Sequence, residues 1–297
     1  MQKSIIAVLF ICVCVVWGST WFAMEIAVQS LSSPMVNALR FAIASPIVVV
    51  IALIAKKPLL FPSGAKRWML PISIVYFAIP FTLMTYSELY VSPGLSAIIF
   101  SLMPLVVVFI SRFFDRVRLS RNSLIGLLIA IVTLSLIVNL ELDLTQNPNA
   151  YKGIISLALA LSLHALVYVY TKHKLNNIDV LTFNAIPAFV ASLFLFMFSC
   201  LNGLDSLNGV NASTMFAIAY LAVFGSVLGI VAYCKLNQLV SSFTASLCFL
   251  TFPLVSLIIS TALKGNVLSP LSITILPIYL LGVYLIIRNK KEYYHES

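Results

Sequence analysis

The stretch Trp17-Gly18-Ser19-Thr20-Trp21, with Glu25 four residues further on, lies late in the first long apolar segment. On a helix, Trp17, Trp21 and Glu25 share one face, because residues four apart stack on neighbouring turns. Polar groups in hydrocarbon are costly unless they face a partner or a water-filled cavity. Either the tryptophans anchor the helix at the membrane interface, or this face lines a cavity. The depth of Trp17 favours the cavity.

The composition predicts a chain that lives in a lipid bilayer. Of its 297 residues, 61% are hydrophobic and 9% are charged, whereas soluble domains carry about 25% charged residues. We therefore expect a polytopic membrane protein. The net charge of +9 does not indicate nucleic-acid binding, because the basic residues lie at the ends of apolar runs. The five cysteines follow no disulfide or metal-ligand spacing, so no metal or other cofactor is expected.

Ten apolar segments are expected to be transmembrane helices, since a span needs about 20 apolar residues. Their predicted ranges are 4–27, 34–55, 69–89, 93–114, 122–140, 151–171, 180–201, 213–235, 241–263 and 270–288. With the N-terminus inside, the predicted inner segments hold fifteen lysines and arginines and the outer loops only two. The fold class is thus all-α integral membrane, with both termini cytoplasmic.

Collinear matches with a shift of 147 to 149 residues relate the two halves of the chain. They are Asn37-Ala38 with Asn184-Ala185, Ala44-Ser45 with Ala191-Ser192, and Pro104-Leu105-Val106 with Pro253-Leu254-Val255. We predict two five-helix repeats, 1–145 and 146–297. Five is an odd number, so the second repeat enters the membrane from the opposite side. Such inverted repeats are typical of transporters that work by alternating access.

The chain resembles the drug/metabolite transporter superfamily, in its ten-helix branch with two EamA-type repeats. The resemblance covers nearly the whole chain and rests on four short motifs. These are Trp17-Gly18-Ser19-Thr20-Trp21, Arg40-Phe41, Ser96-Ala97 with Pro104, and Ala245-Ser246 with Pro253. It implies export of small metabolites, amino acids or drugs from the bacterial cytoplasm across the inner membrane, through a central cavity between the repeats. His164 stands where the family commonly has a tryptophan in helix six, a departure that bears on the substrate.

Two buried titratable residues each admit two interpretations. Arg40, inside a predicted span, has either a structural role or a functional one. In the structural role it forms an ion pair, with Glu25 as the nearest acid by depth, or snorkels to the outer headgroups. In the functional role it holds a substrate carboxylate or an outer gate. His164 is either a hydrogen-bonded structural residue or a proton relay for antiport. The whole set expected along the substrate pathway is Trp17, Ser19, Thr20, Trp21, Glu25, Asn37, Arg40, Tyr86, His164, Tyr168 and Asn184.

Small and helix-breaking residues are expected to shape the bundle. Pro104 and Pro253 are predicted to be symmetric bends that shape the cavity. Gly225 and Gly229 form a small-xxx-small face suited to close helix packing.

The function predicted from these patterns is secondary transport of a small-molecule substrate. No glycine-rich phosphate loop and no catalytic serine-histidine-acid set is found in the sequence, so neither ATP coupling nor an enzyme is expected. Transport is then facilitated or driven by a proton or ion gradient. The alternatives are a multidrug or nucleotide-sugar carrier, a channel or sensor, and a membrane enzyme acting on lipid-linked substrates. Scattered acidic residues argue against the enzyme.

Overall fold

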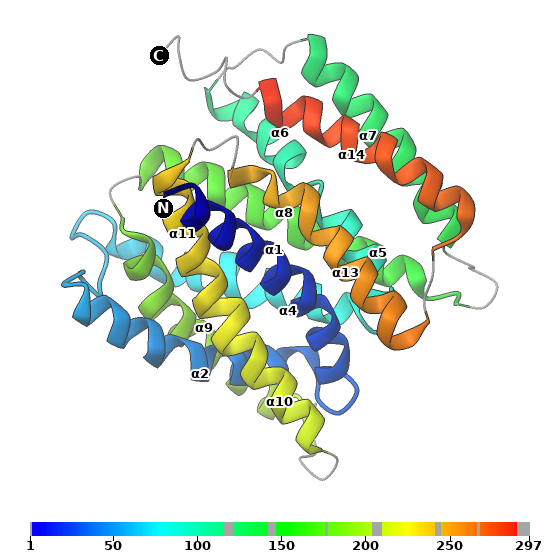
Figure 1. Ribbon diagram of the computed structural model, residues 1–297. Helices are drawn as coiled ribbons and strands as arrows, with labels where there is room; N and C mark the ends of the chain where they lie inside the picture. Colours follow the sequence, from blue (N-terminus) through cyan, green and yellow to red (C-terminus); the bar gives the residue numbers. More distant parts are fainter. Residues whose placement is uncertain are drawn as a thin grey trace.

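The computed structural model describes residues 2–115, 121–141, 147–175, 178–203, 210–240, 245–265 and 268–289. Within these ranges the chain is helical and contains no strand (Figure 1). The predicted repeat boundary at residues 145 and 146 lies outside the described residues, as do the C-terminal residues after 289.

Helices of the first half follow one another with short connections. They are α1 (Gln2–Ala27), α2 (Ser33–Ile54), η1 (Lys66–Trp68), α3 (Met69–Ile72), η2 (Ser73–Ala78), α4 (Ile79–Ser87), α5 (Pro93–Phe100), α6 (Met103–Asp115) and α7 (Arg121–Glu141). Those of the second half are α8 (Ala150–Lys174), α9 (Val180–Leu201), α10 (Ala212–Tyr220), η4 (Leu221–Leu228), α11 (Gly229–Leu239), α13 (Cys248–Lys264) and α14 (Pro270–Asn289). Among the described residues, eight helical segments are long and apolar enough to cross a membrane, and two shorter apolar helices accompany them.

Polar side chains at the helix starts explain where several helices begin. Ser32 Oγ accepts a hydrogen bond from the Met35 N–H at the start of α2 (3.4 Å). Asp179 Oδ1 accepts one from the Leu181 N–H at the start of α9 (2.9 Å). These caps satisfy backbone donors that the first helical turn leaves without partners. An ion pair between Lys57 and Asp179 (3.0 Å) adds a link between the end of α2 and the start of α9.

Two segments are π-helical, and they occupy equivalent places in the two halves. η2 covers Ser73–Ala78 and η4 covers Leu221–Leu228. Subtracting the repeat shift of 147 residues places η4 at 74–81, where it overlaps η2. A π-helix is rare and is frequently found at functional sites. Each of these two segments continues into α-helix on both sides.

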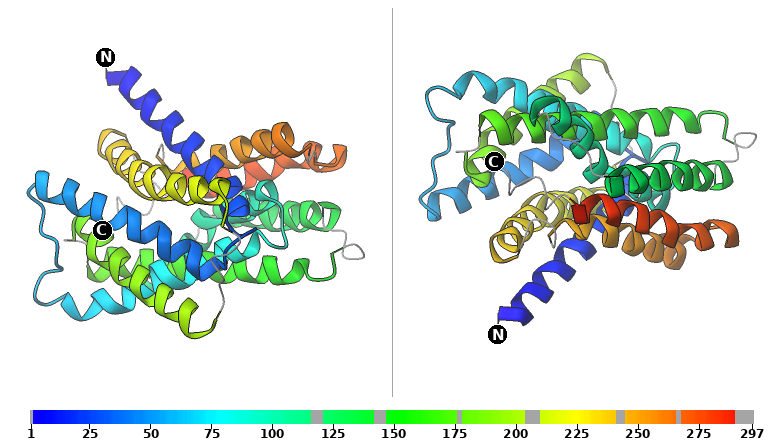
Figure 2. Two further views of the ribbon diagram at one scale, coloured as in Figure 1. Left: turned by 90° about the horizontal axis from the view of Figure 1, so that it is seen from below. Right: turned by 90° about the horizontal axis from the view of Figure 1, so that it is seen from above.

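The helix contacts of one half are matched by equivalent contacts of the other half. α2 packs along α9, and α7 along α14, so each of these helices contacts its own counterpart. α1 packs against α13 and α11, and correspondingly α8 packs against α6 and α4. Figures 1 and 2 show α7 and α14 side by side at one end of the molecule. This arrangement is the one expected of two repeats related by a two-fold axis.

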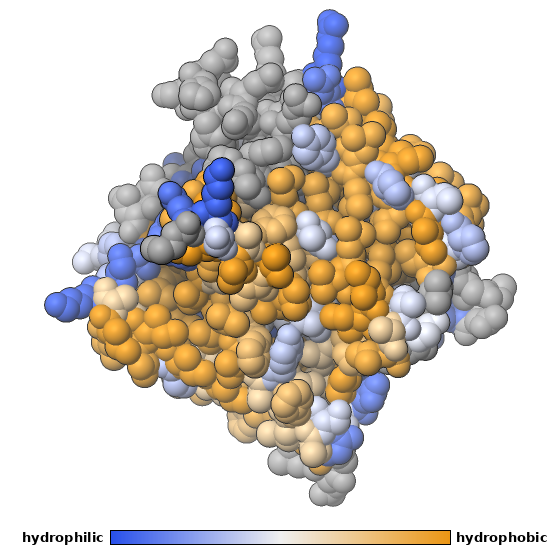
Figure 3. Space-filling model, viewed as in Figure 1, coloured by the Kyte–Doolittle hydropathy of each residue, from blue (hydrophilic) through white to orange (hydrophobic). Residues whose placement is uncertain are grey.

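The outer surface is mainly apolar. Large hydrophobic side chains such as Ile54 and Leu201 are exposed, with 78% and 82% of their surface accessible. Figure 3 shows hydrophobic side chains over most of one face, with hydrophilic ones gathered toward its margins. So large an apolar surface fits contact with lipid rather than with water.

Candidate functional site

A cavity of about 190 Å³ lies between the two halves. Residues from α1, α2, α4, α5, α6, α8, α9, α11, α13 and both π-helical segments line it. The lining residues are Trp17, Thr20, Trp21, Met24, Arg40, Phe41, Ala44, Ser45, Val48, Tyr76, Phe77, Phe81, Met84, Phe100, Met103, His164, Asn184, Ala188, Gly225, Ser226, Ile230, Phe249 and Phe252. Most are aromatic or aliphatic, with a few polar groups among them, as is typical of small-molecule sites.

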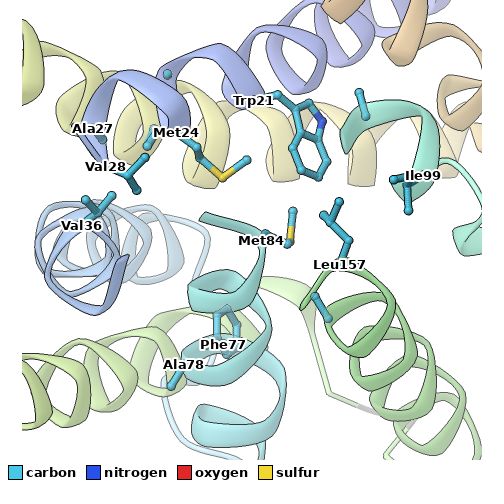
Figure 4. Packing of buried hydrophobic residues seen from close by; sticks show 14 of the residues in the cluster. Trp21, Met24, Ala27, Val28, Val36, Phe77, Ala78, Met84, Ile99 and Leu157 are labelled. Atoms are coloured by element: carbon cyan, nitrogen blue, oxygen red, sulfur yellow. The ribbon is translucent and has the colours of Figure 1, made fainter. Parts of the chain in front are cut away.

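One face of α1 forms part of the wall. Trp17, Thr20, Trp21 and Met24 all line the cavity, because positions three and four apart lie on the same side of a helix. Trp21 is almost fully buried and packs against Phe100, with ring centroids 5.4 Å apart. Figure 4 shows Trp21 and Met24 pointing from α1 into the space between the helices. Both tryptophans of the Trp17–Trp21 motif therefore face the cavity.

Arg40 brings a positive charge into this cavity. Its side chain is only 4% exposed. The Nε–H donates a hydrogen bond to Ser226 Oγ (2.8 Å), and the guanidinium carbon lies 4.7 Å from the centre of the Phe81 ring. Arg40 forms no ion pair with a carboxylate of the described residues, and Glu25 does not line the cavity. A structural pairing with Glu25 is one of the two interpretations of Arg40, and the ion pairs of the described residues do not include it.

His164 contributes a second polar group from α8. It is 6% exposed and stands edge-on to Tyr76, Phe81 and Phe100, with ring centroids 4.8, 5.1 and 6.0 Å apart. Its Nε2 is buried and has no hydrogen-bond partner in the described part of the chain. A buried polar atom of this kind calls for a partner from outside the protein.

Two glycines allow the helices to approach at the site. A Cβ atom at Gly229 would lie 2.5 Å from Trp17 Nε1, and one at Gly225 would lie 2.8 Å from Thr20 Cγ2. Neither position has room for a larger residue unless the neighbouring side chain moves. The close packing predicted from the small-xxx-small spacing is confirmed, and it serves to seat the cavity residues of α1.

Several residues expected along the pathway do not line this cavity. Asn37 is fully buried and donates from Nδ2 to Thr85 Oγ1 (2.9 Å) between α2 and α4. Ser19 contacts the Tyr220 hydroxyl (2.6 Å), and Tyr86 contacts that of Tyr90 (3.0 Å). Tyr168 is 46% exposed.

The two prolines hold different positions in their helices. Pro104 is the second residue of α6 and follows the turn at 101–102 that separates α5 from α6. Pro253 lies inside α13. Met103 and Phe252, their neighbours in the chain, line the cavity.

Other lining residues were not anticipated from the sequence. Phe77, Phe81 and Phe100 could not be told from lipid-facing residues, because both environments are apolar. Ser45 did carry a signal, since the match of Ala44-Ser45 with Ala191-Ser192 marks it as a repeat position. No group of three or more metal-ligating side chains is found in the part of the chain that is described.

The apolar outer surface and the spanning helices indicate a multi-pass membrane protein with a cavity between its two similarly packed halves. A profile of the EamA-like transporter family matches residues 4–139 and again residues 151–288. The chain belongs to this family of membrane transporters.

Curated relatives agree with the family. An uncharacterized transporter of Buchnera aphidicola subsp. Schizaphis graminum is 40% identical over 86% of this chain and 85% of its own length. Protein PagO of Salmonella typhimurium is 36% identical over 96% of this chain and 93% of its own. The inner membrane transporter YedA of Escherichia coli K12 is 26% identical over 93% of this chain and 88% of its own. With the apolar helices, these relatives indicate a multi-pass protein of the inner membrane.

The fold itself also has a solved counterpart. One crystal structure superposes with a TM-score of 0.67 and covers 99% of both chains, at 12% sequence identity. At this identity the likeness concerns the fold alone.

Proposed function

We propose that this chain is a secondary transporter that exports amino acids or related small metabolites by alternating access. The observation that carries the proposal is Arg40, a cation buried in the wall of the cavity between the two halves. A buried charge is costly unless it is paired. A guanidinium whose protein partner is the neutral Ser226 hydroxyl retains donors suited to a carboxylate.

The arrangement of the helices supports alternating access. α2 with α9 and α7 with α14 form contacts between counterparts, and the π-helical segments on both sides carry lining residues such as Phe77 and Ser226. Two repeats of opposite orientation supply matching inward and outward gates. In this proposal ten helices cross the membrane, both termini are cytoplasmic, and a proton or ion gradient supplies the driving force.

Counterflow in proteoliposomes tests the proposal. Purified protein is reconstituted with an unlabelled compound inside, and uptake of the labelled compound is measured for a panel of amino acids, their related carboxylates and drugs. We expect exchange of at least one carboxylate-bearing compound, and its loss in Arg40→Gln. The matched control is Arg67→Gln, which removes an arginine that lies against Trp68 outside the cavity. Folded protein that exchanges none of the compounds contradicts the proposal.

A further inference from the structure

Arg40 and His164 meet at one ring in the cavity wall. The Arg40 guanidinium carbon lies 4.7 Å from the centre of the Phe81 ring, and the His164 ring centroid lies 5.1 Å from the same centre. Arg40 comes from α2 and His164 from α8, so each half of the chain supplies one of the two groups. Both groups pack against the same Phe81 ring.

Both groups offer hydrogen bonds to the same kind of ligand. A guanidinium presents five N–H donors in a rigid fork that matches a carboxylate. Its Nε–H is used by Ser226, which leaves the donors on the two Nη atoms. The tautomer of His164 with hydrogen on Nε2 adds a further donor, and this nitrogen has no partner among the described residues.

The rest of the lining favours an apolar body and repels a second cation. Trp17, Trp21 and Phe252 contribute aromatic surface from α1 and α13. Arg40 is the charged side chain among the described lining residues, so the cavity wall is positive overall. In a water-poor site, a ligand ammonium group would meet the charge of Arg40 at low effective dielectric.

We infer that the cavity selects small carboxylates with an aromatic or apolar body and no amino group, over the corresponding amino acids and amines. The inference rests on the proposed function, in that it takes this cavity as the site of the transported solute. The proposed function names amino acids or related small metabolites as substrates, and this inference restricts them to one chemical class. Arg40 and His164 bind the carboxylate, and the aromatic wall covers the body.

The selectivity is tested on purified protein in detergent with three compounds that each carry a phenyl ring. They are 3-phenylpropionate, phenylalanine and phenethylamine, which are respectively an anion, a zwitterion and a cation. Trp17 and Trp21 line the cavity, so binding is measured from tryptophan fluorescence and, independently, from the shift in unfolding temperature. We expect 3-phenylpropionate to bind at least tenfold more tightly than phenethylamine and severalfold more tightly than phenylalanine.

Variants assign the selectivity to the two residues. Arg40→Gln should reduce the advantage of the anion over the amine at least tenfold. His164→Gln, which keeps an N–H donor, should retain more anion affinity than His164→Leu, which has none. Equal or tighter binding of the amine or of phenylalanine, measured on the unmodified chain, overturns the inference. So does an absence of 3-phenylpropionate binding by both readouts in protein that unfolds cooperatively.

Binding and transport can fail separately. If the expected order of binding holds but no compound shows counterflow, the selectivity stands and the transport proposal is wrong. If counterflow succeeds with amino acids while 3-phenylpropionate neither binds nor competes, transport stands and the selectivity is wrong.

Discussion

Gly229→Ala adds one methyl group at the point where α11 meets the indole of Trp17. The new Cβ would lie 2.5 Å from Trp17 Nε1 and 3.0 Å from Cδ1. Favourable contacts between heavy atoms begin at about 3.5 Å, so the indole must move by about 1 Å. On its other sides Trp17 packs against Tyr233 and Phe249, with ring centroids 5.0 and 5.8 Å away. The easiest direction of movement is into the cavity.

The size of the effect follows from the cost of overpacking. Extra methylene groups in a packed core cost about 1–3 kcal/mol, equivalent to about 5- to 150-fold in an equilibrium constant. Because Trp17 lines the cavity, much of this cost should appear in substrate binding. We expect the concentration for half-maximal counterflow to rise at least fivefold, together with a lower unfolding temperature.

Gly153→Ala provides the matched control. Its Cβ would lie 2.5 Å from Val91 Cγ2, an equally close contact, at a position that does not line the cavity. This variant should lower the unfolding temperature and leave the half-maximal concentration unchanged. Gly64→Ala, with nothing within 4 Å of its Cβ, should change neither. If Gly229→Ala loses stability but keeps the affinity of the unmodified chain, Trp17 does not shape the binding site.

Three further predictions concern the side chain of Arg40, the neighbouring cysteines of α1 and α13, and the membrane topology. Arg40→Lys keeps the charge but loses the planar fork, so export should fall at least tenfold; full activity would show that the charge alone suffices. Cys14 on α1 and Cys248 on α13 belong to one buried cluster. Oxidation by copper-phenanthroline, which takes two electrons and two protons from the thiols, should therefore block counterflow reversibly, and Cys14→Ser should be insensitive. A phosphatase fused within 141–150 should be active and one fused after Glu292 inactive; the reverse pattern would invert the predicted topology.

The parts of the fold that were predictable depend on periodicity and on local chemistry. Long apolar runs gave ranges close to those of α1, α2 and α9, because a bilayer demands both length and hydrophobicity. Ser32 caps the start of α2, a position that serine commonly occupies. The contact of α2 with α9 is a finding of the structure, and it fits inverted repeats, which bring equivalent helices to a common axis.

The site was only partly predictable. A sequence shows how deep a residue lies along a spanning helix more clearly than which neighbour its side chain faces. Trp17, Trp21 and Arg40 line the cavity, as polar or amphipathic residues in a span should. Glu25 shares the expected face of α1 but is not among the residues that line the cavity. The spacing of residues on a helix does not show where along the helix a cavity ends. Phe77 was missed for a further reason: the π-helical turn of η2 changes which side of the segment each residue faces.

The paired π-helical segments also carry information about descent. A π turn closes its hydrogen bonds one residue further along than an α turn, so it holds one residue that a regular helix of the same span lacks. η2 and η4 overlap after the repeat shift, and the family profile matches both halves. One insertion, made before the two matching halves arose by duplication, explains both π-helical turns more simply than two independent insertions.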